Sequence, residues 1–167
     1  NLNHIARAKG EIIDNISKSG SLIIDRDSKF YSYFKSKAIK RKIKVFSVGY
    51  NSKSDVKIIK VKDFFNYKLI TIKSFGKDYK FKIKGQLIKN ISFAIAALEI
   101  LNLNISRIKN KIQNIKILEG RGKIYKVKYK NFNFNLIDES YNANPLSMKQ
   151  TILNLSNIKN NNCKYIL

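Results

Sequence analysis

The sequence of 167 residues is poor in the residues that build disulfides, zinc sites and flexible linkers. Its single cysteine, Cys163, excludes an internal disulfide, and its single histidine, His4, leaves no Cys/His cluster for zinc. Seven glycines and one proline form no Gly/Pro/Ser-rich tract of the kind that makes a flexible linker. These scarcities count against a disulfide-stapled module and against a zinc-binding domain.

Long apolar runs are also absent from the sequence. No stretch approaches the roughly 18 to 20 apolar residues that cross a bilayer, and the N-terminus lacks the pattern of a secretory signal. We therefore expect a cytoplasmic protein with no membrane partner. The composition is 44% hydrophobic and 11% aromatic, which is enough to bury a core.

Negative charge is scarce, since 11 acidic residues face 34 basic ones and the formal net charge is +23. Basic chains often bind nucleic acid by neutralising phosphates, so a basic nucleic-acid-binding module is one hypothesis. Nearly all of the excess is lysine, however, whereas phosphate and base recognition favours the guanidinium of arginine. Because Lys, Ile and Asn recur throughout, we interpret the charge as codon preference at solvated positions and expect no nucleic-acid partner.

The order of apolar patterns is typical of an α/β fold, because strand-like runs alternate with helical ones. The patterns predict helices at about 5–17, 27–39, 87–101 and 105–115, and strands at 21–25, 43–48, 56–61, 69–74 and 79–83. Turn signals between the last three strands indicate an antiparallel addition to the sheet. After Gly120, two further strands (124–129 and 132–137) and a helix beginning at Pro145 indicate a second domain.

Three segments could carry chemistry, and the first reads I-A-R-A-K-G-E-I at 5–12. At about 100° per residue, Lys9 shares one helix face with Ile5, Ile12 and Ile16. A lysine held against apolar surface has a lowered pKa, which makes the neutral amine accessible. The alternative is that Lys9 extends its amine past its own methylenes into water.

The second segment, L-I-D-E-S-Y-N-A-N-P-L-S-M at 136–148, describes a strand, a turn and a helix with Pro145 at its first position. Asp138 and Glu139 fall at the end of the strand, where open α/β sheets bind ligands. They could accept hydrogen bonds from ribose hydroxyls or help to hold a magnesium ion. Equally, they and the nearby asparagines could serve only the turn and the helix cap.

The third segment reads E-G-R-G at 119–122. Glycines on both sides of Arg121 allow unusual backbone angles, and the guanidinium could then bind a phosphate through two hydrogen bonds. The same segment could be a surface hinge with a solvated arginine.

Taken together and in this order, the three segments resemble the Mur ligases, and 136–148 resembles the start of the C-terminal domain in the MurF type. The resemblance implies an α/β fold in which part of a central ATP-binding domain, a mixed sheet with helices (1–119), precedes the start of a Rossmann-like C-terminal domain (120–167). It also implies a monomeric enzyme of peptidoglycan synthesis. With ATP and Mg²⁺, such an enzyme joins D-alanyl-D-alanine to UDP-N-acetylmuramoyl-tripeptide through an acyl phosphate.

The resemblance assigns a role to several residues of these segments. Lys9 matches the family lysine whose carbamate coordinates magnesium, and Arg121 matches an arginine that contacts the ATP phosphates. Asp138 and Glu139 match the family's acidic pair, of which the second is expected at the ribose and is here one methylene longer than Asp. Asn142 and Asn144 lie in the matching S-Y-N-A-N-P and are expected to bind substrate.

A weaker match lies at Lys89-Asn90, where the family has His-Asn before an Ala-rich helix that contacts the adenine. Asn90 carries over as a nucleotide-binding residue, whereas the histidine is replaced by Lys89 and a second family asparagine by Phe93. The alternative is a helix cap followed by a core helix. His4 matches no family role.

No phosphate loop of the G-x-x-G-K-[ST] kind occurs in these 167 residues. We therefore expect an internal portion of a MurF-type ligase that is inactive by itself. A non-catalytic subunit of a split ligase is the other alternative.

Overall fold

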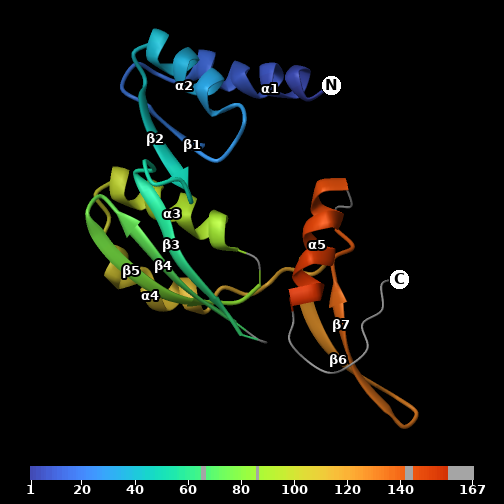
Figure 1. Cartoon of the computed structure of the whole chain (residues 1–167). Helices are drawn as coiled ribbons and strands as arrows, with labels where there is room; N and C mark the ends of the chain where they lie inside the picture. The colour runs from blue at the N-terminus through green and yellow to red at the C-terminus, as the bar shows by residue number, and fades with distance from the viewer. Residues whose placement is uncertain (65–66, 86, 142–144, 158–167) are drawn as a thin grey trace.

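The computed structural model describes residues 1–64, 67–85, 87–141 and 145–157, and it has a five-stranded sheet with helices and a separate two-stranded sheet (Figure 1). The first part of the chain forms α1 (Leu2–Gly10), the 3₁₀ helix η1 (Glu11–Asn15), β1 (Ser21–Asp25), α2 (Tyr31–Lys40), β2 (Lys44–Gly49), β3 (Val56–Asp63), β4 (Lys68–Ser74) and β5 (Lys77–Ile83). The second part forms α3 (Ile88–Ile100), α4 (Ile105–Gln113), β6 (Lys123–Tyr129), β7 (Phe132–Asp138) and α5 (Pro145–Asn157).

The larger sheet is mixed, with the strand order β1-β2-β3-β4-β5. Its first three strands are parallel, and β2 meets β3 only through the pairs Val48–Val56 and Gly49–Lys57. The strands β3, β4 and β5 are antiparallel. This arrangement confirms the predicted α/β fold and the antiparallel addition.

The antiparallel strands follow the alternation of their sequences. In β4, Ile70 and Ile72 are buried, whereas the lysine that follows, Lys73, is exposed. The turn between β4 and β5 consists of Phe75 and Gly76, with φ of 44° and 86°, the two positive values that a two-residue type I′ turn requires. Local sequence therefore sets both the register and the buried face.

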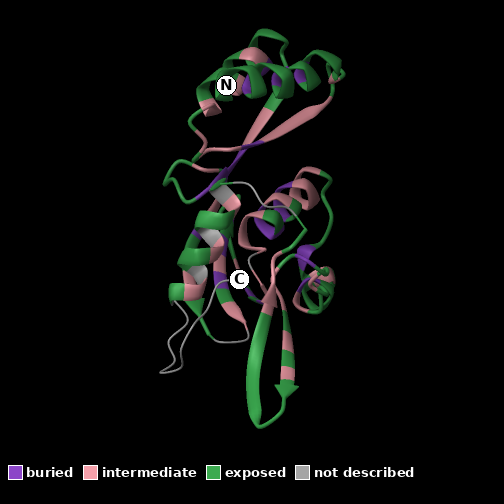
Figure 2. Ribbon diagram, turned by 90° about the vertical axis from the view of Figure 1, so that its right-hand side faces the viewer, coloured by how far each residue is buried: buried purple, intermediate pink, exposed green. Residues whose placement is uncertain are grey.

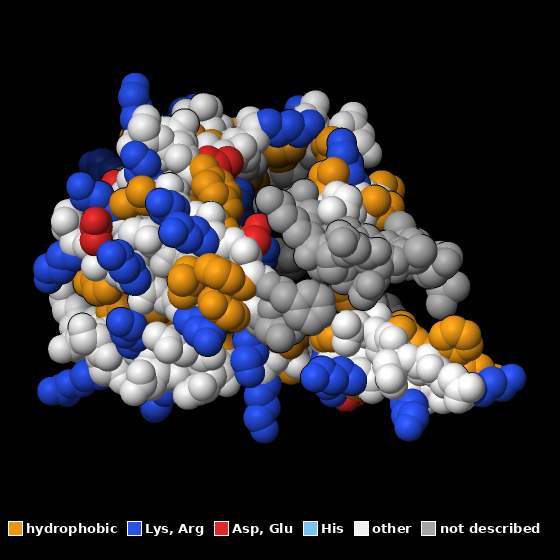
Figure 3. All heavy atoms as spheres, turned by 60° about the horizontal axis from the view of Figure 1, so that its bottom comes forward, with side chains coloured by type: hydrophobic (Ala, Val, Ile, Leu, Met, Phe, Trp, Pro, Cys, Tyr) orange, Lys and Arg blue, Asp and Glu red, His pale blue; other side chains and the backbone are white. Residues whose placement is uncertain are grey.

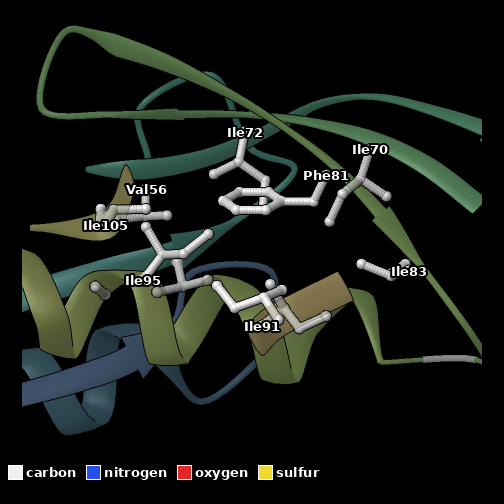
Figure 4. Close-up of a cluster of buried hydrophobic side chains, with 11 residues drawn as sticks. Val56, Ile70, Ile72, Phe81, Ile83, Ile91, Ile95 and Ile105 are labelled. Carbon is white, nitrogen blue, oxygen red and sulfur yellow. The ribbon is translucent and has the colours of Figure 1, made fainter. Parts of the chain in front are cut away.

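The main core lies between α3 and the sheet (Figure 4). Ile91 and Ile95 of α3 point toward Ile72 and Phe81, and all of these side chains are at most 4% exposed. Burying each such Ile or Phe side chain stabilises the fold by roughly 1.5–3 kcal/mol. The core thereby fixes α3 against the sheet.

A second core, made of Ile13, Ala38 and Ile43, joins η1 to α2 and the start of β2. The expected helix at 5–17 ends at Gly10 and continues as a 3₁₀ helix, which has about three residues per turn. The buried residues of α1 and η1 are consequently Ala6, Gly10 and Ile13.

The predicted apolar helix face that Lys9 would share with Ile5, Ile12 and Ile16 is therefore wrong. Lys9 is exposed, and its expected neighbours Ile5 and Ile12 are 52% and 66% exposed. That prediction assumed one uninterrupted 3.6-residue period. The change of helix type after Gly10 breaks the period and moves Ile12 off the expected face. Lys9 and Ile5 thus lie on the exposed side of α1, whose buried residues are Ala6 and Gly10.

The helix expected from residue 27 begins later, at Tyr31. The main-chain amide of Asp27 donates to Asp25 Oδ1 (2.9 Å), and that of Phe30 donates to Ser28 Oγ (3.2 Å). These bonds hold 25–30 in turns before the helix starts. Asp27 is thereby placed beside the end of β2.

The strands β6 and β7 form a hairpin on one side of the mixed sheet (Figure 1). Most of its residues are exposed, as Figure 2 shows in green, and none is buried. Its strands and the helix beginning at Pro145 agree with the expected elements. In the described part of the chain, no helix is long and apolar enough to cross a membrane.

Candidate functional site

The structure brings together two of the three segments, the turn at 119–122 and the end of β7. The amide of Gly120 donates to Asp138 Oδ2 (2.9 Å), and the amide of Gly122 donates to the Asp138 carbonyl (2.8 Å). The Tyr141 amide donates to the Gly120 carbonyl (3.1 Å). Residues 18 positions apart in sequence therefore form one unit, with Asp138 at its centre.

Gly120 and Gly122 are required by this close approach. Their φ angles are 69° and 83°, in the left-handed region that favours glycine. A Cβ on Gly120 would lie 2.7 Å from the Tyr141 amide nitrogen, and one on Gly122 would lie 3.1 Å from Glu139 Oε1. Gly120 therefore lets the main chain approach Tyr141, and Gly122 lets it approach the Glu139 carboxylate.

Arg121 projects from this turn and is exposed. Its guanidinium carbon lies 4.3 Å from the centre of the Tyr141 ring, a cation–π contact that orients the side chain. Among the described residues Arg121 forms no ion pair. Its N–H groups are thus available to an anion, as the phosphate-binding role requires.

The two carboxylates of the site are in different environments. Hydrogen bonds from the Ser140 hydroxyl, the Ser140 amide and the Gly120 amide lower the pKa of Asp138, which holds it ionised. Burial, and then the charge of Asp138, raise the pKa of Glu139. Asp138 is committed to the turn, and Glu139 is the carboxylate that remains for a ligand.

Asn90 lies in the first turn of α3, where its side chain is exposed. No hydrogen bond of its side chain occurs in the described part of the molecule, so both its donor and acceptor groups are available to a ligand. Asn142 and Asn144 fall outside the described residues. The structure therefore leaves Asn90 free for the adenine role expected from the resemblance.

Lys9 lies on α1 with a solvent-accessible amine and no ion pair to any described residue. Within the described ranges, no group of three or more His, Cys, Asp or Glu side chains could hold a metal ion. Magnesium at phosphoryl-transfer sites usually takes one or two carboxylates, with phosphate oxygens and water filling the other positions. A single carbamate on the free amine of Lys9 fits that ligand set.

Sequence reasoning missed a charged cluster at the carboxyl ends of β1 and β2. Lys89 Nζ donates to Asp25 Oδ2 (2.6 Å) and lies 3.3 Å from Asp27 Oδ2. The amides of Tyr50 and Asn51 donate to the Asp27 carboxylate at 2.9 and 3.1 Å. The acidic pair at 25 and 27 was the available signal, but its partner lies 64 residues away from Asp25.

The charges of this cluster reinforce one another. Partial burial works to raise the pKa of Asp27, but the amides of Tyr50 and Asn51 together with Lys89 outweigh it and leave that pKa lowered. Burial also works to lower the pKa of Lys89, but the bonds and charges of Asp25 and Asp27 outweigh it and raise that pKa. Asp27 and Lys89 are therefore both charged at neutral pH.

Basic side chains are distributed rather than gathered on the face in Figure 3, where uncharged and apolar side chains separate the Lys and Arg residues. No continuous basic groove crosses the described part of this face.

Comparison with known families identifies the chain. Residues 1–101, more than half of its length, match the Mur ligase middle domain. The chain belongs to the Mur ligase family. Family membership accounts for the mixed sheet with α3 against it, which is the arrangement expected for the central domain.

Relatives in this Mur ligase family include two curated UDP-N-acetylmuramoyl-tripeptide--D-alanyl-D-alanine ligases. The one from Buchnera aphidicola subsp. Baizongia pistaciae is 31% identical over 92% of this chain and 33% of its own length. The one from Rickettsia prowazekii is 29% identical over 96% of this chain and 36% of its own length. The chain thus spans about a third of the length of these relatives.

Solved Mur ligase structures share the fold. MurF from Acinetobacter baumannii matches 95% of this chain and 34% of its own with a TM-score of 0.81 and 20% identity. MurF ligase from Thermotoga maritima in complex with ADP matches 93% of this chain and 35% of its own with a TM-score of 0.72 and 18% identity.

Proposed function

We propose that this Mur ligase chain supplies part of the nucleotide site of a MurF-type enzyme. Such an enzyme joins D-alanyl-D-alanine to UDP-N-acetylmuramoyl-tripeptide at the expense of ATP. The observation that carries the proposal is the hydrogen bonding of the glycine turn to the end of β7, which joins the segment that carries Arg121 to the segment that carries Glu139. Similarity to two curated ligases of that name supports the choice of substrates.

Each group at the site has a role that its chemistry allows. Arg121 binds the nucleotide phosphates, because its planar donors match phosphate oxygens and no described carboxylate occupies them. Glu139 accepts hydrogen bonds from the ribose hydroxyls, and Asp138 holds the turn that carries Arg121. Asn90 has both a donor and an acceptor for the edge of the adenine.

Lys9 carries the metal function in this proposal. Its neutral amine would add CO₂ and release a proton to solvent, and the resulting carbamate would supply one negative oxygen ligand to Mg²⁺. A magnesium ion held there would neutralise charge that develops on the transferred phosphoryl group. Support comes from the family match and from the accessible amine, which forms an ion pair with no described residue. Asn142 and Asn144 are proposed to contact the amino-acid substrate.

Binding of Mg·ADP to the chain tests the nucleotide site. In amide NMR spectra of the labelled chain, we expect the largest shift changes at Asn90, at Arg121 and Gly122, and at Glu139. Arg121→Ala should weaken binding about tenfold, because a charge-assisted pair to phosphate is lost. Arg107→Ala, which removes an exposed arginine of α4, is the matched control and should leave affinity unchanged. Shift changes confined to other residues would contradict the proposed site.

A further inference from the structure

Lys89 ties three separate parts of the chain together. Lys89 belongs to the first turn of α3, and its ammonium contacts the carboxylates of Asp25 and Asp27. Asp25 is the last residue of β1, and the Asp27 carboxylate accepts hydrogen bonds from the two main-chain amides that follow β2. Gly49 allows this, because a Cβ there would lie 2.7 Å from Asp27 Oδ1. The bridge therefore joins the helix start to the carboxyl ends of two parallel strands, where α/β sheets bind ligands.

We propose that Lys89 is a positioning residue that holds the first turn of α3, and with it Asn90, in place for the nucleotide. This inference rests on the role given to Asn90 in the proposed function. It concerns Lys89, Asp25 and Asp27, to which the family resemblance gives no role.

Among the described residues, no other charged side chain ties the first turn of α3 to the rest of the fold. Its N-cap position is Leu87, which offers no capping hydrogen bond, and the turn contains no acidic residue. Unpaired helix N-termini are the parts of helices that fray most readily. The contact of Lys89 with the two carboxylates supplies the fixed point that a capping side chain would otherwise give.

Lys89 lies at the N-terminus of α3, where a positive charge is unexpected. A positive charge at a helix N-terminus is unfavourable, because the helix dipole places its positive end there. Two carboxylates, within 2.6 and 3.3 Å of the ammonium, offset that repulsion. A lysine at this site is thus stabilised only by the bridge.

A lysine makes the bridge independent of pH around neutrality, whereas a histidine at this position would titrate near neutral pH. The groups facing position 89 are Asp25, Asp27 and Tyr50, and burial raises the pKa of Tyr50. At pH 6–8 the Asp27 carboxylate, whose pKa is lowered, is ionised, and Tyr50, whose pKa is raised, is neutral. A histidine at position 89 would change its charge in this range, whereas a lysine would not.

The test compares Lys89→Met, Lys89→Arg and Lys89→His with the native chain. The first readout is the hydrogen-exchange protection of the Ile91 amide, which donates to the Leu87 carbonyl in the first turn (2.9 Å). The second is the dissociation constant for Mg·ADP. Lys37→Met is the matched control, since it removes a similar bridge (2.7 Å to Asp14) on α2.

We expect Lys89→Met to lower Ile91 protection about fivefold relative to core amides such as that of Ile95, and to weaken Mg·ADP binding by a similar factor. Lys89→Arg should stay within about twofold of native, because it keeps the charge. Lys89→His should resemble the native chain at pH 6 and Lys89→Met at pH 8. The imidazolium is stabilised by the carboxylates below its raised pKa, and its charge is lost as pH rises through that value.

The outcomes separate the two proposals. Unchanged Ile91 protection in Lys89→Met overturns the anchoring role. Native-like Mg·ADP affinity in Lys89→Met, with a clear Asn90 shift in the native chain, overturns the positioning role but leaves the proposed function intact. If Mg·ADP perturbs no site residue of the native chain, the proposed function fails and the positioning role for the nucleotide falls with it. An equal loss in Lys37→Met would show a general effect of removing a bridge and would overturn the inference.

Discussion

Lys9 is a residue whose replacement should change the chemistry of the site without changing the stability of the fold. Its side chain is exposed on α1, while the buried residues of that helix are Ala6 and Gly10. Replacing it should consequently remove a functional group without opening a cavity. A loss of activity in a Lys9 variant would therefore report on the proposed carbamate and not on unfolding of the enzyme.

A hybrid ligase provides that enzyme: the Buchnera aphidicola relative in which the matching third is replaced by these 167 residues. We expect Lys9→Ala to reduce ligation at least about a hundredfold, because a negative ligand is lost where phosphoryl charge develops. Lys9→Arg should fail as completely, since guanidinium cannot take up CO₂ and adds positive charge. A small carboxylate such as acetate should restore part of the activity to Lys9→Ala and none to Lys9→Arg.

The control for this experiment is Arg7→Ala, which removes another exposed cation from the same helix and should be near normal. If both Lys9 variants keep near-normal turnover with unchanged magnesium dependence, the metal role of Lys9 is wrong.

For single residues, the sequence predicted which residues belong to the site better than it predicted what surrounds each of them. Arg121, Asp138 and Glu139 were singled out, and the structure brings their segments together. The apolar face assigned to Lys9 was predicted wrongly, and the exposed side chain agrees with the alternative of an amine extended into water. The bridge of Lys89 was not predicted at all, because no local pattern reveals a contact across 64 residues.

The glycine turn between α4 and β6 is the element that assembles the site. Both of its glycines have positive φ, but only Gly120 lies against main-chain atoms. Gly76, in the turn between β4 and β5, has a similar φ of 86°, and a Cβ added there would meet nothing within 4 Å. An alanine at Gly76 would therefore show the strain of a positive φ alone, whereas an alanine at Gly120 would add a clash with Tyr141.

Gly76→Ala should therefore cost about 1–2 kcal/mol, the strain of a left-handed alanine alone. Gly120→Ala should cost at least about 1 kcal/mol more, because its Cβ would lie 2.7 Å from the Tyr141 amide nitrogen. Hydrogen exchange measures the effect: protection across the β6–β7 pairs should fall in Gly120→Ala, and protection across β4–β5 should fall in Gly76→Ala. Equal and small losses at both sites would show that the turn can relax and is not needed in this form.

Whole elements were predicted well wherever one pattern governs them. The strands β1 to β7 lie within two residues of their expected limits, because alternation and turn residues act locally. The late start of α2 was missed, since Asp25 and Ser28 accept main-chain hydrogen bonds in a turn. The 3₁₀ helix η1 was missed because its sequence also suits an α-helix.

On the scale of the molecule, the proposed site draws on distant parts of the sequence, from Lys9 through Asn90 and Arg121 to Glu139. The chain spans about a third of its curated relatives, and its 167 residues contain no phosphate loop. We therefore expect ligation to need parts of the relatives that lie outside the matching third. The hybrid ligase supplies those parts.

The most direct measurement is the release of ADP by the hybrid ligase, with and without each substrate. We expect turnover that requires both UDP-N-acetylmuramoyl-tripeptide and D-alanyl-D-alanine, survives Arg107→Ala, and falls at least about a hundredfold in Arg121→Ala. A hybrid that is folded by circular dichroism yet releases no ADP with both substrates would contradict the proposed function, as would turnover that Arg121→Ala leaves unchanged.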